Sequence, residues 1–107
     1  MTIETKDKLP YFAWKMSILT WAMDKYGQEK QIDQLIEECA ELIVSLQHMK
    51  RGRTTWAEVA GEMADVTIML DQMKTIDTVD KAVNDMVDYK LKRLEQRLVN
   101  RLVEESK

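Results

Sequence analysis

Four carboxylates in two evenly spaced pairs are the residues of this chain best suited to chemistry. Glu38 and Glu41 form the first pair and Glu62 and Asp65 the second, and the members of each pair are three positions apart inside an apolar stretch. On a helix, residues three apart are neighbours on the same side, so each pair would present both carboxylates together. Four such groups beside a core would repel one another strongly unless a cation lay between them. The pattern therefore indicates a divalent metal site, and such a metal points to phosphate chemistry.

The donor types around the pairs favour a hard cation. Carboxylate oxygens suit magnesium, for which manganese would substitute, whereas imidazole or thiolate ligands would favour zinc, iron or copper. The single His48 lies seven positions after Glu41, so it does not form the Glu-x-x-His pair of di-iron bundles. The single Cys39 can form neither an intrachain disulfide nor a zinc site. We expect Mg²⁺, and the alternative is that each acidic pair is a plain solvated helix face.

The elements that must position these carboxylates are helices. The chain has only three Gly and one Pro, and it is rich in Met, Glu, Lys and Leu, which favour helix. Pro10 suits a helix start, Gly27 and Gly52 suit helix stops, and Thr55 with Glu58 has the spacing of a capping box. The predicted helices cover residues 11–26, 29–51, 56–75 and 79–104. With no strand and short connections, we expect an all-α fold, a four-helix bundle in which neighbouring helices are antiparallel.

A helical-wheel projection places the acidic pairs beside the predicted core. The buried stripe of the second helix would comprise Leu35, Cys39, Leu42 and Leu46, and that of the third Val59, Met63, Val66 and Leu70. Glu38 falls at the edge of the first stripe, with Glu41 further out on the same side. Glu62 and Asp65 occupy the equivalent edge of the second stripe. If the two helices pack antiparallel, all four carboxylates can converge.

Length and charge narrow the class of protein. The 107 residues fit one domain, residues 1–107. The net charge of −3 argues against a general nucleic-acid-binding surface. No apolar run approaches a membrane span, and the N-terminus from Met1 to Pro10 is too polar for a signal peptide. We therefore expect a cytoplasmic protein with neither nucleic acid nor a membrane as partner.

The first helix has apolar residues on two sides, which predicts that it is buried twice. One stripe comprises Phe12, Met16, Leu19, Met23 and Tyr26, and another on roughly the opposite side comprises Trp14, Ile18 and Trp21. In a chain this short the second layer would be another subunit, so we expect a homodimer or tetramer. The alternatives are that Trp14 and Trp21 cover the domain's own core, or that one of them stacks on a base.

The acidic segments resemble the signature of a known enzyme family. Glu37-Glu38-Cys39-Ala40-Glu41-Leu42 followed by Glu62-Met63-Ala64-Asp65-Val66 is similar to the E-E-x-x-E … E-x-x-D pattern of the MazG-like all-α nucleoside triphosphate pyrophosphatases, in particular their short stand-alone bacterial and phage forms. The resemblance covers the chain from about Tyr26 onward. It implies an oligomeric helical bundle that converts a nucleoside triphosphate and water into a monophosphate and pyrophosphate, and so acts on the nucleotide pool.

The resemblance also implies roles for individual residues. Glu38, Glu41, Glu62 and Asp65 would be the Mg²⁺ ligands, and Glu37 would help bind a further metal or orient the attacking water, the alternative being a plain surface glutamate. With a metal bound, a carboxylate would accept the proton of that water, and Glu37 and Glu38 are the catalytic candidates. The segment 66–70 lacks the aromatic-His pair typical of the related phosphoribosyl-ATP pyrophosphohydrolases. Two alternatives stay open: a hydrolase of the same superfamily directed at dUTP or dCTP, and a non-catalytic helical protein that binds a partner. Base and sugar preference also stay open, with a lean to purine triphosphates.

Basic and amide side chains are candidates for binding the substrate. Lys90 interrupts the apolar line of the last helix and Arg93 follows it, so we expect both to bind the triphosphate, the alternative being that they snorkel over apolar surface or pair with neighbouring glutamates. Gln31 and Gln34 precede Glu38 by seven and four positions. They share its side of the helix and could read the edge of a base, the alternative being ordinary polar helix positions.

Overall fold

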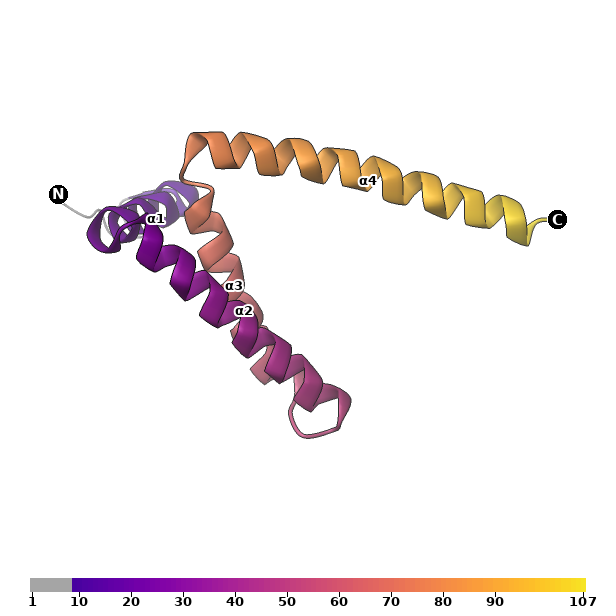
Figure 1. The fold of residues 1–107 in the computed structure, drawn as a ribbon, viewed down its shortest axis with the longest axis horizontal. Helices are drawn as coiled ribbons and strands as arrows, with labels where there is room; N and C mark the ends of the chain where they lie inside the picture. The colour runs from indigo at the N-terminus through magenta and orange to yellow at the C-terminus, as the bar shows by residue number, and fades with distance from the viewer. Residues whose placement is uncertain (1–8) are drawn as a thin grey trace. The chain divides into compact units, whose positions relative to one another are not determined.

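The computed structural model describes residues 9–107, and every regular element in this part of the chain is a helix. The helices are α1 (Tyr11–Tyr26), α2 (Gln28–Lys50), α3 (Trp56–Met73) and α4 (Asp77–Glu105) (Figure 1). The predicted all-α class is confirmed, and each predicted boundary lies within two residues of the observed one. Residues 1–8, which carried most of the argument against a signal peptide, lie outside the described part.

The chain divides after Ile76 into two compact units. The first contains α1, α2 and α3, and the second consists of α4 and the last residues. The two units are described separately below, and the expected single domain stays a prediction.

Glycines with positive φ end two of the helices where the sequence predicts. Gly27 has φ 86°, a conformation that residues with a side chain rarely adopt. Its N–H donates to the carbonyl of Met23 at 2.9 Å, and its own carbonyl accepts from the N–H of Gln31 at 3.1 Å. One residue therefore ends α1 and starts α2. Gly52, with φ 70°, follows α2 in the same way.

The predicted capping box of Thr55 and Glu58 at the start of α3 is not formed. Thr55 is the N-cap residue and its carbonyl accepts from the N–H of Val59 at 3.1 Å, but its side chain makes no capping hydrogen bond. The hydroxyl of Thr54 instead donates to the carboxylate of Glu58. The Thr-x-x-Glu spacing identified the start of the helix correctly, whereas the backbone of the loop brings the preceding threonine to the glutamate.

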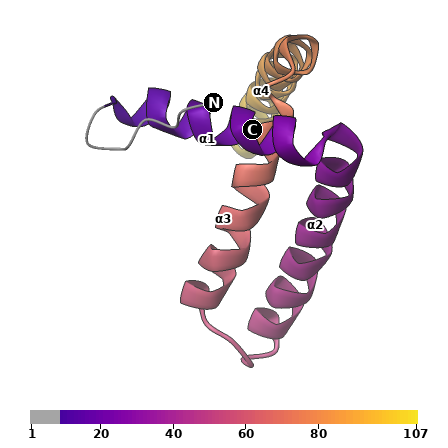
Figure 2. The ribbon, with the colours of Figure 1, turned by 90° about the vertical axis from the view of Figure 1, so that its left-hand side faces the viewer.

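The helices α2 and α3 form an antiparallel hairpin, and α1 packs across the end where α2 begins and α3 finishes (Figure 2). Two polar contacts fix this end. The buried amides of Gln31 and Gln72 are hydrogen-bonded to each other, with Gln72 Nε2 as donor. The Lys15 ammonium contacts Asp71 Oδ2 at 2.6 Å. All three helices of the first unit are thus tied together by polar side chains near one end.

The rotation of α3 differs from the prediction. Met63 and Leu70, expected in the core, are 49% and 48% exposed, whereas Val59 and Met69 are buried. The side of α3 that faces α2 therefore comprises Val59, Glu62, Val66 and Met69. Glu62 consequently lies within the packed face rather than at its edge.

Few apolar side chains are fully buried in the described chain. Leu19, Val59 and Met69 are the buried hydrophobic residues, whereas Phe12 is 72% exposed. The α4 helix has no buried residue. Its side chains pair along its own surface, as Lys81 does with Asp85 at 2.8 Å, and its leucines, Leu91, Leu94, Leu98 and Leu102, are exposed. The expected second layer over α1 stays a prediction.

Candidate metal centre

Three of the four predicted ligands come together between α2 and α3. Glu38, Glu41 and Glu62 each offer a carboxylate oxygen, and these oxygens all lie within 4.8 Å of one another. The first two belong to consecutive turns of α2, and the third faces them from α3. Asp65 is exposed one turn further along α3 and lies outside this group.

The Gln31–Gln72 contact explains why these residues meet. Glu41 lies ten residues after Gln31 on α2, and Glu62 lies ten residues before Gln72 on α3. Because both helices rise by about 1.5 Å per residue, positions equally far from a contact in an antiparallel pair lie opposite each other. The amide pair therefore sets the register that places Glu41 beside Glu62, with Glu38 one turn away.

Two carboxylate oxygens of the group are buried without a hydrogen-bond partner. They are Glu38 Oε2 and Glu62 Oε2, which no donor in the described part of the chain satisfies. The other oxygen of Glu38 accepts from Gln34 Nε2 at 2.7 Å, which fixes the direction of that carboxylate. A buried polar atom without a partner is unfavourable, and a group of three carboxylates with two such oxygens is suited to a cation.

The negative charges of the group act on one another. Glu38 raises the pKa of Glu41 above its ordinary value of 4.5, and desolvation and the charges of Glu62 and Glu37 raise it further. The cause is the crowding of carboxylates, which favours the protonated form of one of them. A divalent cation would relieve the same repulsion. Glu37 itself is exposed beside the group.

The remaining candidates lie in different surroundings. Gln31 is buried, and its carbonyl oxygen is engaged by Gln72. Gln34 donates a hydrogen bond to Glu38, one of the three grouped carboxylates. Lys90 and Arg93 are exposed on α4, in the other unit, and the guanidinium carbon of Arg93 lies 5.9 Å from the ring centre of Tyr89. Their expected contact with phosphate stays a prediction.

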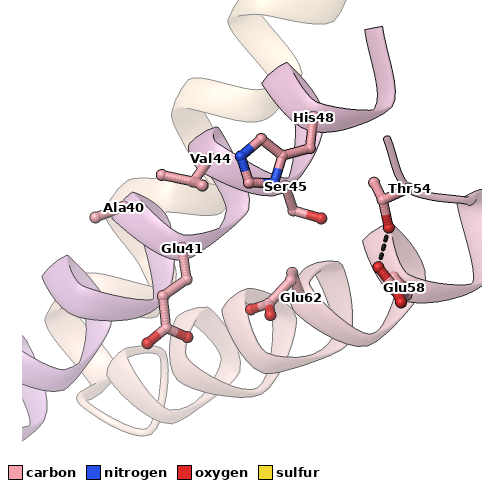
Figure 3. Close-up of a pocket in the computed structure, with 8 residues that line it drawn as sticks. All are labelled: Ala40, Glu41, Val44, Ser45, His48, Thr54, Glu58 and Glu62. Atoms are coloured by element: carbon pink, nitrogen blue, oxygen red, sulfur yellow. Dashed lines mark hydrogen bonds between the residues drawn. The ribbon is translucent and has the colours of Figure 1, made fainter. Parts of the chain in front are cut away.

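A pocket that the sequence did not predict opens next to the three grouped carboxylates. Its volume is about 560 Å³, and Glu41 and Glu62 form part of its wall. Figure 3 shows the other lining residues, which are Ala40, Val44, Ser45, His48, Thr54 and Glu58. Ser45 and His48 follow Glu41 by four and seven positions, which is the spacing of residues on one side of a helix. That spacing was the signal in the sequence.

A second, smaller pocket of about 400 Å³ lies toward the other end of the hairpin. It is lined by Ala22, Tyr26, Lys30, Gln31, Gln34 and Gln72. The Gln34 side chain, which binds Glu38, connects its wall to the carboxylate group. The acidic group thus has a pocket on each side along the hairpin.

Within the described residues, no helix is both long and apolar enough to cross a membrane. No protein-family model, curated protein or solved structure matches this chain.

Proposed function

We propose that this chain is a Mg²⁺-dependent nucleoside triphosphate pyrophosphohydrolase of the MazG-like class, which converts a (d)NTP and water into a (d)NMP and pyrophosphate. The observation that carries the proposal is the meeting of the Glu38, Glu41 and Glu62 carboxylates, in which Glu38 and Glu62 each have a buried oxygen without a hydrogen-bond partner. The two-part acidic motif supports the choice of reaction. A cytoplasmic homodimer or tetramer that acts on the nucleotide pool is part of the proposal.

The donor set fits magnesium. The ion takes oxygen ligands, keeps several waters, and is usually held by a few carboxylates together with substrate phosphates. Glu38, Glu41 and Glu62 would hold it, with Asp65 from the next turn of α3 as the proposed fourth ligand. Manganese, which also accepts oxygen ligands, would substitute. When bound, Mg²⁺ would neutralise charge on the phosphate oxygens and make water more acidic.

The protein's own residues would orient the reactants. Gln34 holds Glu38 by the hydrogen bond to Oε1, so the second oxygen of that carboxylate keeps a fixed direction. Glu37 and Glu38 are both candidates to accept the proton of the water that attacks the α-phosphorus. The proposal assigns phosphate binding to Lys90 and Arg93. Accordingly, Lys90→Ala should raise KM with little change in kcat, and unaltered kinetics would remove Lys90 from the site.

A product assay tests the proposal directly. The full chain is incubated with each common NTP and dNTP and Mg²⁺, and monophosphate, diphosphate, phosphate and pyrophosphate are resolved. We expect monophosphate and pyrophosphate, lost in Glu38→Gln and kept in Asp33→Asn, a control on the exposed side of α2. Diphosphate with phosphate, or no turnover with Mg²⁺ or Mn²⁺, would overturn it. Turnover of dUTP or dCTP alone would identify the narrower hydrolase.

The second candidate is a non-catalytic helical protein that binds a partner. The exposed apolar side chains favour it, since Phe12 on α1 is 72% exposed and Leu102 on α4 is 66% exposed. Such exposure is typical of surfaces that another protein covers. In that case the acidic group would be a solvated rim, and Mg²⁺ would leave the melting temperature unchanged.

A further inference from the structure

The 560 Å³ pocket beside the carboxylates has features that the hydrolysis of a triphosphate does not by itself require. We infer that it is the nucleobase subsite, that the base lies against His48, and that Glu58 selects guanine by accepting hydrogen bonds from its N1–H and N2 amino group. This inference rests on the proposed function, because the phosphates of the same nucleotide would lie at Glu38, Glu41 and Glu62.

The composition of the pocket suits a base better than phosphate. Ala40 and Val44 give it an apolar wall, and the Val44 side chain is 52% exposed. Of the lining residues that the structure describes, only His48 can carry a positive charge, whereas Glu58 adds a further carboxylate at the far end. A phosphate tail would be repelled there. A flat, neutral group with hydrogen-bond donors on its edge would be accommodated.

The length of the pocket fits a nucleoside whose phosphates lie at the neighbouring carboxylates. His48 lies seven residues after Glu41 on α2, which corresponds to about 10 Å along the helix. Glu58 lies four residues before Glu62 on α3, which corresponds to about 6 Å. The far end is thus one nucleoside away from the site where the α-phosphate would be held. The pocket and the carboxylate group share Glu41 and Glu62, so one ligand can occupy both.

Glu58 is held in place for recognition. The Thr54 hydroxyl donates to its Oε2 (Figure 3), which restrains the carboxylate in the pocket wall. A carboxylate accepts several hydrogen bonds through its two oxygens and donates none when ionised. Guanine presents two adjacent donors on one edge, whereas adenine and cytosine each place an acceptor beside their amino group. Glu58 therefore favours guanine, and uracil offers it only one N–H.

His48 supplies the flat surface. Its imidazole lies on the same side of α2 as Glu41 and Ser45 and is exposed in the pocket wall (Figure 3). Bases stack on aromatic side chains regardless of their identity. Loss of this ring should weaken binding of every base by about 10-fold. Loss of the Glu58 charge should instead affect guanine alone.

The test is to measure the equilibrium binding of nucleoside monophosphates to the full chain in the presence of Mg²⁺. Calorimetry gives the affinities, and the NMR signals of the single histidine report whether the base lies against it. We expect GMP to bind about 10-fold more tightly than AMP, with IMP, which lacks the amino group, between them. GMP should also shift the His48 ring signals. The preference should disappear in Glu58→Gln and persist in Glu29→Gln, which likewise replaces a glutamate in the first turn of a helix.

A second pair of variants covers the case in which Glu58→Gln fails to fold. His48→Ala should weaken GMP and AMP alike, whereas Gln47→Ala, its exposed neighbour, should weaken neither. Equal binding of GMP and AMP, a preference that survives in Glu58→Gln, or unshifted His48 signals would overturn the inference. Cleavage of triphosphates without base preference would leave the proposed function standing and remove the subsite. Selective binding of GMP without any hydrolysis would overturn the proposed hydrolase activity and leave the guanine subsite standing.

Discussion

Replacing Glu62 by leucine should make the metal-free protein more stable while abolishing its response to Mg²⁺. Glu62 lies in the packed face of α3, and its Oε2 atom is buried without a hydrogen bond. Leaving a buried polar atom without a partner costs about 1–3 kcal/mol. Because Glu62 is only partly buried, we expect a gain near the lower end, about 1 kcal/mol. Loss of its repulsion with Glu41 acts in the same direction.

Thermal unfolding in EDTA and in Mg²⁺ measures both effects. For a domain of 60–100 residues, 1 kcal/mol corresponds to a rise in Tm of about 4–8 °C. In the unaltered protein, Mg²⁺ at one hundred times its Kd should add about 2.7 kcal/mol of stability. In Glu62→Leu this addition should vanish, so that the order of the two proteins reverses between EDTA and Mg²⁺.

The control is Asp33→Leu, which removes a carboxylate from the exposed side of α2. It should change the free energy of unfolding by less than about 0.5 kcal/mol and keep the full response to Mg²⁺. If Glu62→Leu were less stable than the unaltered protein in EDTA, the buried oxygen would not be a source of instability. If it kept the Mg²⁺ response, Glu62 would not be a ligand.

Three other predictions concern the polar contacts of the first unit. Lys15→Met should lower the free energy of unfolding by about 1 kcal/mol. The hydrogen bond to Asp71 raises the pKa of Lys15 above 10.5, so the stabilisation by Lys15 should be complete below pH 10.5 and lost as the pH rises through the raised pKa. Denaturant titrations at a series of pH values would measure this loss. Gln72→Leu should cost about 1–3 kcal/mol because it leaves the buried Gln31 amide without its partner, and the double variant Gln31→Leu/Gln72→Leu should recover most of that loss; a double variant as unstable as the single one would contradict this account. Because the pKa of Glu41 is raised, protons should compete with Mg²⁺ for this carboxylate above pH 4.5, and the rise in Tm caused by Mg²⁺ should become smaller as the pH falls toward that value. Over the same pH range, protonation of Glu41 should make the metal-free protein more stable.

The sequence predicted the helices well because their ends are encoded locally. Gly27 and Gly52 adopt positive φ, a conformation that favours glycine and is common where a helix ends. The rotation of α3 was not predictable in this way. Met63 and Leu70 are as apolar as Val59 and Met69, so the helix offers two overlapping apolar directions. The choice between them is made by packing against α2, which a single helix does not contain.

The site was predicted in part for the same reason. The i, i+3 spacing and the antiparallel hairpin predicted that carboxylates of the two helices come together, as Glu38, Glu41 and Glu62 do, but not the Gln31–Gln72 contact that sets their register. The rotation of α3 about its axis then decides which acidic residue of that helix faces α2, and this residue is Glu62 rather than Asp65. The pocket depends on the loop between the helices, where Thr54 rather than Thr55 reaches Glu58. Loop backbone of this kind is poorly determined by residue type.

The buried amide pair at the open end of the hairpin also makes the alignment of the two helices unique. Apolar side chains pack almost equally well if one helix slides by a turn, about 5.4 Å, along the other. Such a slide would separate Gln31 from Gln72 and leave both buried amides without a hydrogen-bond partner. A single polar residue in the core of a coiled coil specifies the register of its helices in the same way. A hairpin with leucine at both positions could be equally stable and yet sample several alignments, with the carboxylates dispersed in most of them. The two glutamines thus disfavour the other alignments, and the carboxylates of Glu38, Glu41 and Glu62 lie together because a single alignment is left.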